Sequence, residues 1–196
     1  MAGQFEAIPG GGAAVALDEV EIAILRSLAV QLMELVGAGD EPAEGADPLA
    51  AILSEGPSKP PADPALARLF PDAYGGPETE PDERTRAYAS EFRRYTENDL
   101  RARKREDALG VVRSLDALTP GGDGGAVLKL SPEASRRWLG ALNDLRLTIG
   151  TRLEVADDDD NNELYRLPDS DPRKPMVMAY LWLGGLQESL VETLMA

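Results

Sequence analysis

Residues 126–153, AVLKLSPEASRRWLGALNDLRLTIGTRL, decide the fold of this chain, because they join a strand directly to an amphipathic helix. Residues 126–130 have the pattern of a short strand and lead into Ser131, a favoured helix N-cap. Pro132 takes the first helical position, where its missing N–H costs nothing. Beyond it, apolar residues recur at helical spacing: Ala134, Trp138, Ala141, Leu142, Leu145, Ile149 and Leu153. The stretch therefore predicts a strand near 126–130 and a long helix that buries one face.

The N-terminal segment repeats this strand-to-helix pattern. Residues 4–8 and 14–17 flank a Pro-Gly-Gly-Gly run at 9–12, which predicts a β-hairpin. Asp18 and Glu21 have the spacing of a capping box, so a helix is expected to begin after Asp18. Its apolar face consists of Ile22, Leu25, Leu28, Leu32 and Leu35. Two explanations of the repeat stay open: an old duplication, or the general likeness of segments in which a strand leads into a helix. If the strands of the two segments pair, they join the two halves of the chain.

Two more helical stretches are predicted: 82–118, as one long helix or two consecutive ones, and 174–195. The first has an apolar stripe, expected to be its buried face, and a bend near 96–99. The stripe is made of Tyr88, Phe92, Tyr95, Ala102, Leu109 and Val112. The second helix is the most apolar of the chain, which favours a place at the centre of the core.

Two segments differ from the rest in composition. Residues 37–81 hold nine of the fifteen prolines, so we expect a partly irregular connection with short helical turns at 47–53 and 63–70. Residues 156–171 are rich in carboxylates, which is typical of a solvated acidic loop. Together, the patterns predict one mainly α domain over 1–196. It is a helical bundle with a small β-sheet made of the N-terminal strands and the strand near 126–130.

Several kinds of chemistry are excluded because the chain has no cysteine and no histidine. Thiolate nucleophiles, disulfides, Cys- or His-ligated metals and imidazole bases are therefore absent. Asp157, Asp159 and Asn161 match the first ligands of a calcium loop, but Asn162 and Pro168 stand where that loop needs Gly and Glu. We expect no metal, no cofactor and no enzymatic activity. A carboxylate-only enzyme, using pairs such as Asp144 with Glu154, is the alternative.

Net charge and hydropathy limit the partners. A charge of −15 opposes binding to nucleic acid or to an anionic membrane by the protein as a whole. The first 17 residues lack Lys, Arg and an apolar run, and the most apolar window, 176–186, is shorter than the roughly 20 residues of a membrane helix. The sequence therefore predicts a cytoplasmic protein without a membrane segment.

Positive charge is concentrated in the helix predicted at 82–118. Between Arg84 and Arg113 lie nine Lys or Arg and five Asp or Glu. One interpretation is a solvated helix with internal pairs such as Glu97 with Arg101. The other is a surface that docks an acidic partner or a phosphate backbone, of which the negative charge of the surrounding protein disfavours the second. The candidate docking residues are Arg93, Arg94, Arg101, Arg103, Lys104 and Arg105.

Four segments together resemble a known family: RLFPDAY at 68–74, EFRR at 91–94, WLGALNDLRL at 138–147 and WLGGLQE at 182–188. The chain is similar over nearly its whole length to actinobacterial AosR-like oxidative-stress transcriptional regulators. The resemblance implies a regulator that contacts the transcription machinery, with a sigma factor as the candidate partner. Cysteine-based sensing does not carry over, because this chain has no cysteine. The family's gene neighbourhood implies an alternative: an adaptor or stability factor for ClpS proteolysis or for sulfur-carrier cysteine synthesis.

Overall fold

The fold is mainly α with a small antiparallel sheet, as predicted. The computed structural model describes residues 3–37, 56–76, 80–119, 121, 124–155, 164 and 166–195. Within this part of the chain, the elements in order are β1 (Glu6–Ile8), β2 (Gly12–Leu17), α1 (Glu19–Val36), α3 (Pro64–Leu69), α4 (Glu83–Asp116), β3 (Ala126–Leu130), α5 (Pro132–Arg152) and α7 (Lys174–Met195).

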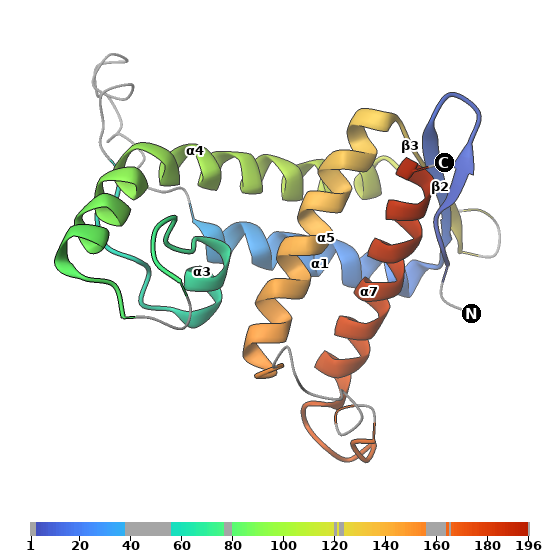
Figure 1. The fold of residues 1–196 in the computed structure, drawn as a ribbon. Helices are drawn as coiled ribbons and strands as arrows, with labels where there is room; N and C mark the ends of the chain where they lie inside the picture. Colours follow the sequence, from blue (N-terminus) through green and yellow to red (C-terminus); the bar gives the residue numbers. More distant parts are fainter. Residues whose placement is uncertain are drawn as a thin grey trace, which may run out of the picture.

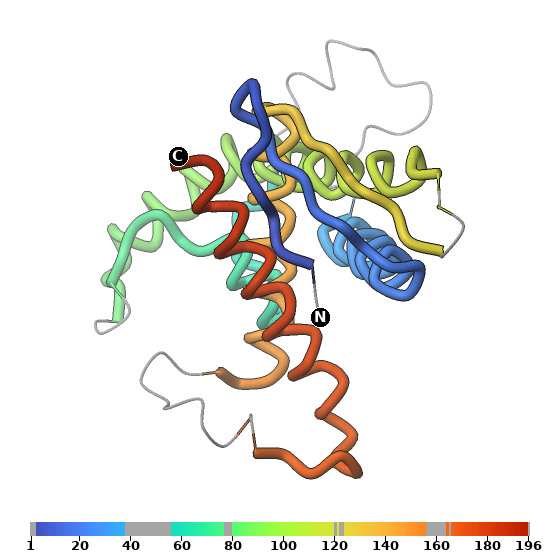
Figure 2. Tube along the Cα trace, turned by 90° about the vertical axis from the view of Figure 1, so that its right-hand side faces the viewer, coloured from blue at the N-terminus to red at the C-terminus, as the bar shows by residue number. Residues whose placement is uncertain are grey.

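The long helices form two crossed layers. α1 and α4 lie side by side in one layer, and α5 crosses them with α7 beside it in the other (Figure 1). The three strands lie together at one end, where α1 and α5 begin and α7 ends (Figures 1 and 2). The opposite end is formed by α3 and the first turns of α4, which extend beyond the crossing helices (Figure 1).

The sheet joins the two halves of the chain, as the repeated pattern suggested. Its strand order is β1-β2-β3, and both pairs are antiparallel. Ala13 pairs with Leu130 and Leu17 with Ala126, so the strand before α1 is bonded to the strand before α5. Gly12 permits this close approach, because a Cβ atom there would lie 2.2 Å from the carbonyl oxygen of Leu130.

The helices α1 and α5 both begin at the predicted caps. Asp18 Oδ1 accepts a hydrogen bond from the Glu21 N–H at 2.8 Å, and Glu21 Oε2 accepts one from the Asp18 N–H at 3.0 Å. In α5, Ser131 Oγ accepts from the Ala134 N–H at 3.2 Å, and Pro132 is the first helical residue. These side chains satisfy N–H groups that the first turn of a helix otherwise leaves unpaired.

The helix at the centre of the core is α5 rather than α7, which corrects the prediction from hydropathy. α5 packs against α1, α3, α4, α7 and the sheet, whereas α7 covers α5 and the hairpin. Trp138 of α5 is 1% exposed, stacks edge-on against Phe5 at 6.0 Å and donates from Nε1 to Ser114 Oγ at 3.2 Å. α7 is less enclosed because only one side of it is covered, so Met176 and Met178 stay exposed.

The predicted apolar stripe of α4 is wrong in its N-terminal half. Tyr88, Phe92 and Tyr95 are exposed, and the buried positions of that half are Ala89, Arg93 and Glu97. The physical reason is that the inner face of this end meets polar groups: the Gly56 N–H donates to the Arg94 carbonyl, and the Phe70 carbonyl and Asp72 accept from Arg93. In the C-terminal half, Ala102 is exposed, against the prediction, and Leu109 is half-buried; Val112 is buried as predicted and packs in the main core. The Thr96 hydroxyl donates to the Phe92 carbonyl at 2.8 Å, a contact typical of a bent helix, and Figure 1 shows α4 curved.

The connections are described only in part. The helical turn predicted at 63–70 is α3, whose Asp63 caps the N–H groups of Ala65 and Leu66 at 2.8 Å and 3.0 Å. The turn predicted at 47–53 lies outside the described residues. So do 156–163 of the acidic segment, including the candidate calcium ligands Asp157, Asp159 and Asn161.

Candidate partner-binding surface

The side of α4 that faces the protein carries a buried chain of charges. Glu97 is 2% exposed and lies between two arginines on the same helix face, one turn before it and one turn after it. One of its oxygens accepts from Arg93, and the other accepts from Arg101 Nε at 2.9 Å and Nη2 at 2.6 Å. Both carboxylate oxygens are therefore satisfied by guanidinium groups inside the protein.

The two arginines extend this network to other elements. Arg93 Nη2 donates to the Phe70 carbonyl at 2.9 Å and to Asp72 Oδ1 at 2.8 Å. Burial works against the charge of Arg93, but its hydrogen bonds to Asp72 and Glu97 outweigh burial and raise the pKa of its guanidinium. Arg101 donates to the carbonyl of Val36, at the end of α1, and stacks over the Phe70 ring at 4.5 Å. The network therefore fixes α1, α4 and the segment after α3 to one another.

A second internal pair joins α4 to α5. Lys104 Nζ lies 2.7 Å from Asp144 Oδ1, and the Asp144 side chain is 4% exposed. Asp107, one turn further along α4, lies against Gly140 of α5, where an added Cβ would come within 2.8 Å of Asp107 Oδ2. Burial raises the pKa of the Asp107 carboxyl; the nearby Arg103 opposes this rise and the charge of Asp144 adds to it.

The raised pKa of Asp107 predicts a pH effect on stability. A carboxyl group whose pKa is higher in the folded state disfavours folding above that pKa, and acidification toward the unfolded value of about 3.8 relieves the penalty. We therefore expect Asp107→Asn to be more stable than the wild type at pH 7 and to lose this advantage as the pH falls toward 4. Urea unfolding of both proteins across this range measures the difference, and an advantage that grows on acidification contradicts the prediction.

The six residues predicted to dock a partner fall into different settings. Arg93, Arg101 and Lys104 hold carboxylates inside the protein. Docking of a partner by the six residues stays a prediction. Arg103 is exposed, and Arg94 and Arg105 are half-buried. The predicted pair between Glu97 and Arg101 is confirmed. The structure thus supports the internal-pairing interpretation for half of the basic residues.

The outer side of the same helix end presents aromatic rings. Tyr74, Tyr88, Phe92 and Tyr95, here called the aromatic row, are 44–64% exposed. Tyr74 lies in the segment after α3, with its ring 6.1 Å from Tyr88 and 5.9 Å from Phe92. Guanidinium groups stack on the row, Arg84 over Tyr88 and Arg94 over Tyr95, each at 5.5 Å. Exposed aromatic and arginine side chains are enriched where proteins bind one another.

Sequence reasoning named the aromatic residues but assigned them to the core. The signal that distinguishes the two faces of α4 is the run Arg93, Glu97 and Arg101, spaced at four residues with the carboxylate between two cations. Such a run pairs its carboxylate with both cations and is stable when buried if another anion, here Asp72, reaches it, so the opposite face is left to the aromatic row. The row itself follows helical spacing at positions 88, 92 and 95.

The described residues offer little for metal or acid–base chemistry. No group of three or more Asp or Glu in this part of the chain is arranged to hold a metal ion. Asp144 is buried and pairs with Lys104, whereas Glu154 is exposed beyond the end of α5. The two carboxylates considered for a carboxylate-only enzyme therefore do not share one environment. None of the described helices is long and apolar enough to cross a membrane.

The chain matches one protein family and several curated relatives. The model of the family described as "Domain of unknown function (DUF2017)" matches residues 2–194. A Mycobacterium tuberculosis (strain H37Rv) protein and a Mycobacterium bovis protein, both named "Oxidative stress regulator AosR", are each 32% identical over 179 residues, which is 89% of this chain and 78% of theirs. A Mycobacterium leprae relative is 31% identical over 188 residues, or 90% of this chain and 79% of its own.

No solved structure is significantly similar to the chain. The family resemblance seen in the four sequence segments is confirmed by the family match over residues 2–194 and by relatives that cover 89% or more of this chain. The chain therefore belongs to the DUF2017 family of domains of unknown function, together with the mycobacterial AosR regulators.

Proposed function

We propose that this protein is a non-enzymatic regulator of the oxidative-stress response that acts by binding a protein of the transcription machinery through the aromatic row on α4. The observation that carries the proposal is the exposed row itself, with arginines stacked on it. The names of the mycobacterial relatives support the regulatory role. A sigma factor is the partner we would test first, because the family resemblance implies it.

The geometry of the row indicates what the partner surface is like. Tyr88, Phe92 and Tyr95 stand at helical positions i, i+4 and i+7, the spacing with which a helix inserts apolar anchors into a groove. Their helix end extends beyond the crossing layer of α5 and α7, so a partner can reach it (Figure 1). Arg84 and Arg103 add positive charge on the same helix. The matching surface is an apolar groove with carboxylates at its rim.

The proposal predicts that single aromatic truncations weaken binding to the partner. We expect Phe92→Ala and Tyr95→Ala each to raise the Kd for a sigma factor or for RNA polymerase holoenzyme by about 10-fold or more, the effect of losing a central anchor at an interface. Biolayer interferometry with the purified proteins measures this. Both side chains are exposed, so folding should be preserved, and far-UV circular dichroism checks that it is.

Val127→Ala is the matched control, because Val127 is 57% exposed but lies on β3, at the other end of the molecule (Figure 1). It should leave the Kd unchanged. Binding of purified ClpS or of the sulfur-carrier protein through the aromatic row, with no binding of polymerase or sigma factor, would replace the regulator by the adaptor. Equal binding by wild type, Phe92→Ala and Tyr95→Ala would show that the row is not the docking surface.

A further inference from the structure

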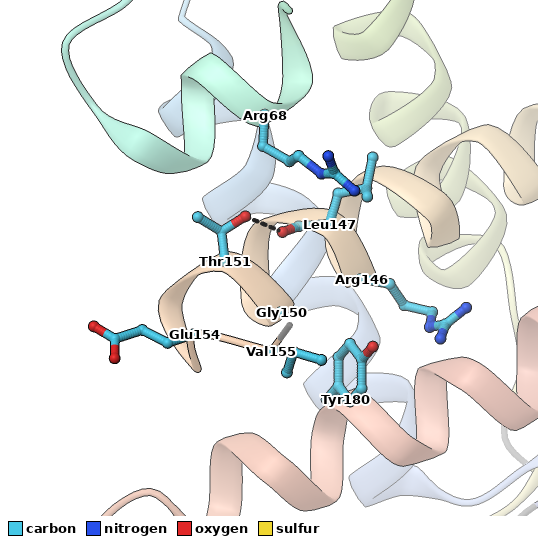
Figure 3. Close-up of a pocket in the computed structure, with 8 residues that line it drawn as sticks. All are labelled: Arg68, Arg146, Leu147, Gly150, Thr151, Glu154, Val155 and Tyr180. Carbon is cyan, nitrogen blue, oxygen red and sulfur yellow. Dashed lines mark hydrogen bonds between the residues drawn. The ribbon is translucent and has the colours of Figure 1, made fainter. Parts of the chain in front are cut away.

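A hollow of about 460 Å³ lies where α3, α5 and α7 meet, and none of its lining residues belongs to α4. Its volume falls within the roughly 300–1,000 Å³ of small-molecule sites. The walls consist of Arg68, Arg146, Leu147, Gly150, Thr151, Glu154, Val155 and Tyr180 (Figure 3). Apolar surface from Leu147, Val155 and the Tyr180 ring is thus combined with two guanidinium groups.

The two arginines have unused donors. Among the described residues, neither Arg68 nor Arg146 has a carboxylate oxygen within 4.0 Å, although the chain has 35 Asp and Glu against 20 Lys and Arg. Arg146 donates from Nη1 to Gln187 Oε1 at 2.6 Å, and its Nη2 makes no hydrogen bond in the described part of the structure. Arg68 makes none there at all. Donors of this kind, in a fork that matches phosphate, are what anion sites use.

Packing holds Arg146 and Tyr180 in place before any ligand arrives. The Arg146 guanidinium lies over the Tyr180 ring at 5.2 Å, a cation–π arrangement. Gly184 packs beside it, since a Cβ there would be in van der Waals contact with Arg146 Nε at 3.6 Å. Tyr180 in turn rests on Gly150, where a Cβ would come within 3.2 Å of the ring. A site whose side chains are already fixed loses little conformational entropy when it binds.

The one carboxylate in the lining is directed elsewhere. Figure 3 shows the Glu154 side chain pointing away from Arg146 and Tyr180. The pKa of Arg173 is raised by its hydrogen bonds to Asp171 and the charge of Asp171, and the charge of Glu154 adds to this rise. Among the described residues that line the hollow, the charges beside Leu147 and Tyr180 are therefore those of Arg68 and Arg146.

We propose that this hollow is a binding site for a small organic phosphate, whose phosphate group is held by Arg68 and Arg146 and whose carbon part lies against Leu147, Val155 and Tyr180. Phosphate fits better than a single carboxylate, because two guanidinium groups from separate helices offer more donors than one carboxylate accepts. The site is independent of the proposed docking of α4, so either proposal is able to fail without the other.

Phenyl phosphate is a suitable probe for the site. We expect the intact protein to bind it saturably in isothermal titration calorimetry, and we expect Arg68→Gln and Arg146→Gln each to raise the Kd about 10-fold or more, the loss of one charge-assisted contact. Arg136→Gln is the matched control, since Arg136 is an exposed arginine of α5 outside the hollow; it should change the Kd less than 2-fold, as a side chain without contact to the ligand.

The choice of variants separates a loss of binding from a loss of folding. Arg68 is exposed and makes no hydrogen bond among the described residues, so Arg68→Gln should unfold with the wild-type urea midpoint. The arginine Nε–H signals in the ¹H–¹⁵N spectrum give a second readout, in which Arg68 and Arg146 should shift on addition of the probe and Arg136 should not. Benzyl alcohol, which lacks the phosphate, should produce neither heat nor shift.

Three results would overturn the proposal. The first is absence of saturable binding of phenyl phosphate to the wild type up to about 10 mM, the weak limit of a useful small-molecule site. The second is an equal rise of the Kd in Arg136→Gln. It would mean that the probe is attracted by the positive charge of the protein in general, as an adventitious ion only. The third is tighter binding of benzoate than of phenyl phosphate, which would mean that the hollow prefers a carboxylate.

Discussion

Replacing Glu97 by alanine is expected to destabilise the protein by about 3–5 kcal/mol, the usual cost of removing one partner from a buried ion pair. Arg101 would lose its carboxylate and Arg93 would keep only Asp72, while the two arginine side chains are 13% and 4% exposed. A guanidinium group cannot give up its proton to escape burial, because its pKa lies above 12. The loss of stability therefore arises either from buried charge without its partner or from movement of α4 away from residues 70–72 and the end of α1.

Equilibrium unfolding in urea measures this loss. With a slope of about 2–3 kcal/mol per M for a chain of this size, the midpoint of Glu97→Ala should fall by about 1–2.5 M. Glu106→Ala is the control, because Glu106 also pairs with an arginine, Arg137, but its side chain is 62% exposed. Surface pairs contribute less than about 1 kcal/mol, so that midpoint should change little. Equal shifts in the two variants would disprove the structural role of the buried network.

Replacing Trp138 by alanine is expected to cost about 3–5 kcal/mol, the range for removing a large aromatic side chain from a packed core. The side chain is 1% exposed and lies on α5, the helix that touches every layer of the fold. Its loss would leave a cavity beneath the sheet, remove the edge-on contact with Phe5 and release the Ser114 hydroxyl from its donor. Cooperative unfolding followed at 222 nm measures the change in stability.

The other tryptophan provides the matched control. Trp182 is partly buried on α7, and its Nε1 is buried without a hydrogen-bond partner among the described residues. Trp182→Phe removes this unsatisfied donor and keeps an aromatic ring, so we expect a change within about 1 kcal/mol. Trp138→Phe should cost more than Trp182→Phe, because it breaks the bond to Ser114. The reverse order would contradict the packing described for α5.

These two predictions separate what holds the fold together from what it presents to partners. Loss of Glu97 or Trp138 would impair every function by unfolding the protein. By contrast, Phe92→Ala and Arg68→Gln alter exposed side chains on different elements and should each affect one binding event. Measuring stability for all four variants is therefore part of interpreting any loss of binding.

Much of the fold was predictable because its signals are local. Asp18 with Glu21, and Ser131 with Pro132, mark helix starts within four residues, and the structure has both helices beginning there. The glycine run at 10–12 predicted the hairpin, and Gly10 and Gly11 have φ angles of +97° and +78°, which glycine adopts without strain. Caps and turns satisfy backbone groups over a few residues, so they are legible without knowledge of distant contacts.

The candidate sites were less predictable, because their partners come from distant parts of the chain. Arg93 pairs with Asp72, 21 residues away; Lys104 pairs with Asp144 at a separation of 40, and Arg101 reaches Val36 at a separation of 65. Hydropathy alone ranks tyrosine and phenylalanine above arginine and glutamate for burial, and it was wrong for this end of α4. The hollow proposed to bind an organic phosphate was not predicted at all, since Arg68, Arg146 and Tyr180 belong to three separate helices.

The sequence by itself determined the helices, the hairpin, their boundaries, the mainly α class and the absence of thiol and imidazole chemistry, because propensity, capping and composition act locally. Only the tertiary structure decided which face of α4 is buried, which of its cations are internal, and which helix lies at the centre. Burial depends on what an element meets: a charged face is stable inside where opposite charges and carbonyl groups arrive from other segments, and an aromatic face stays outside where no neighbour covers it.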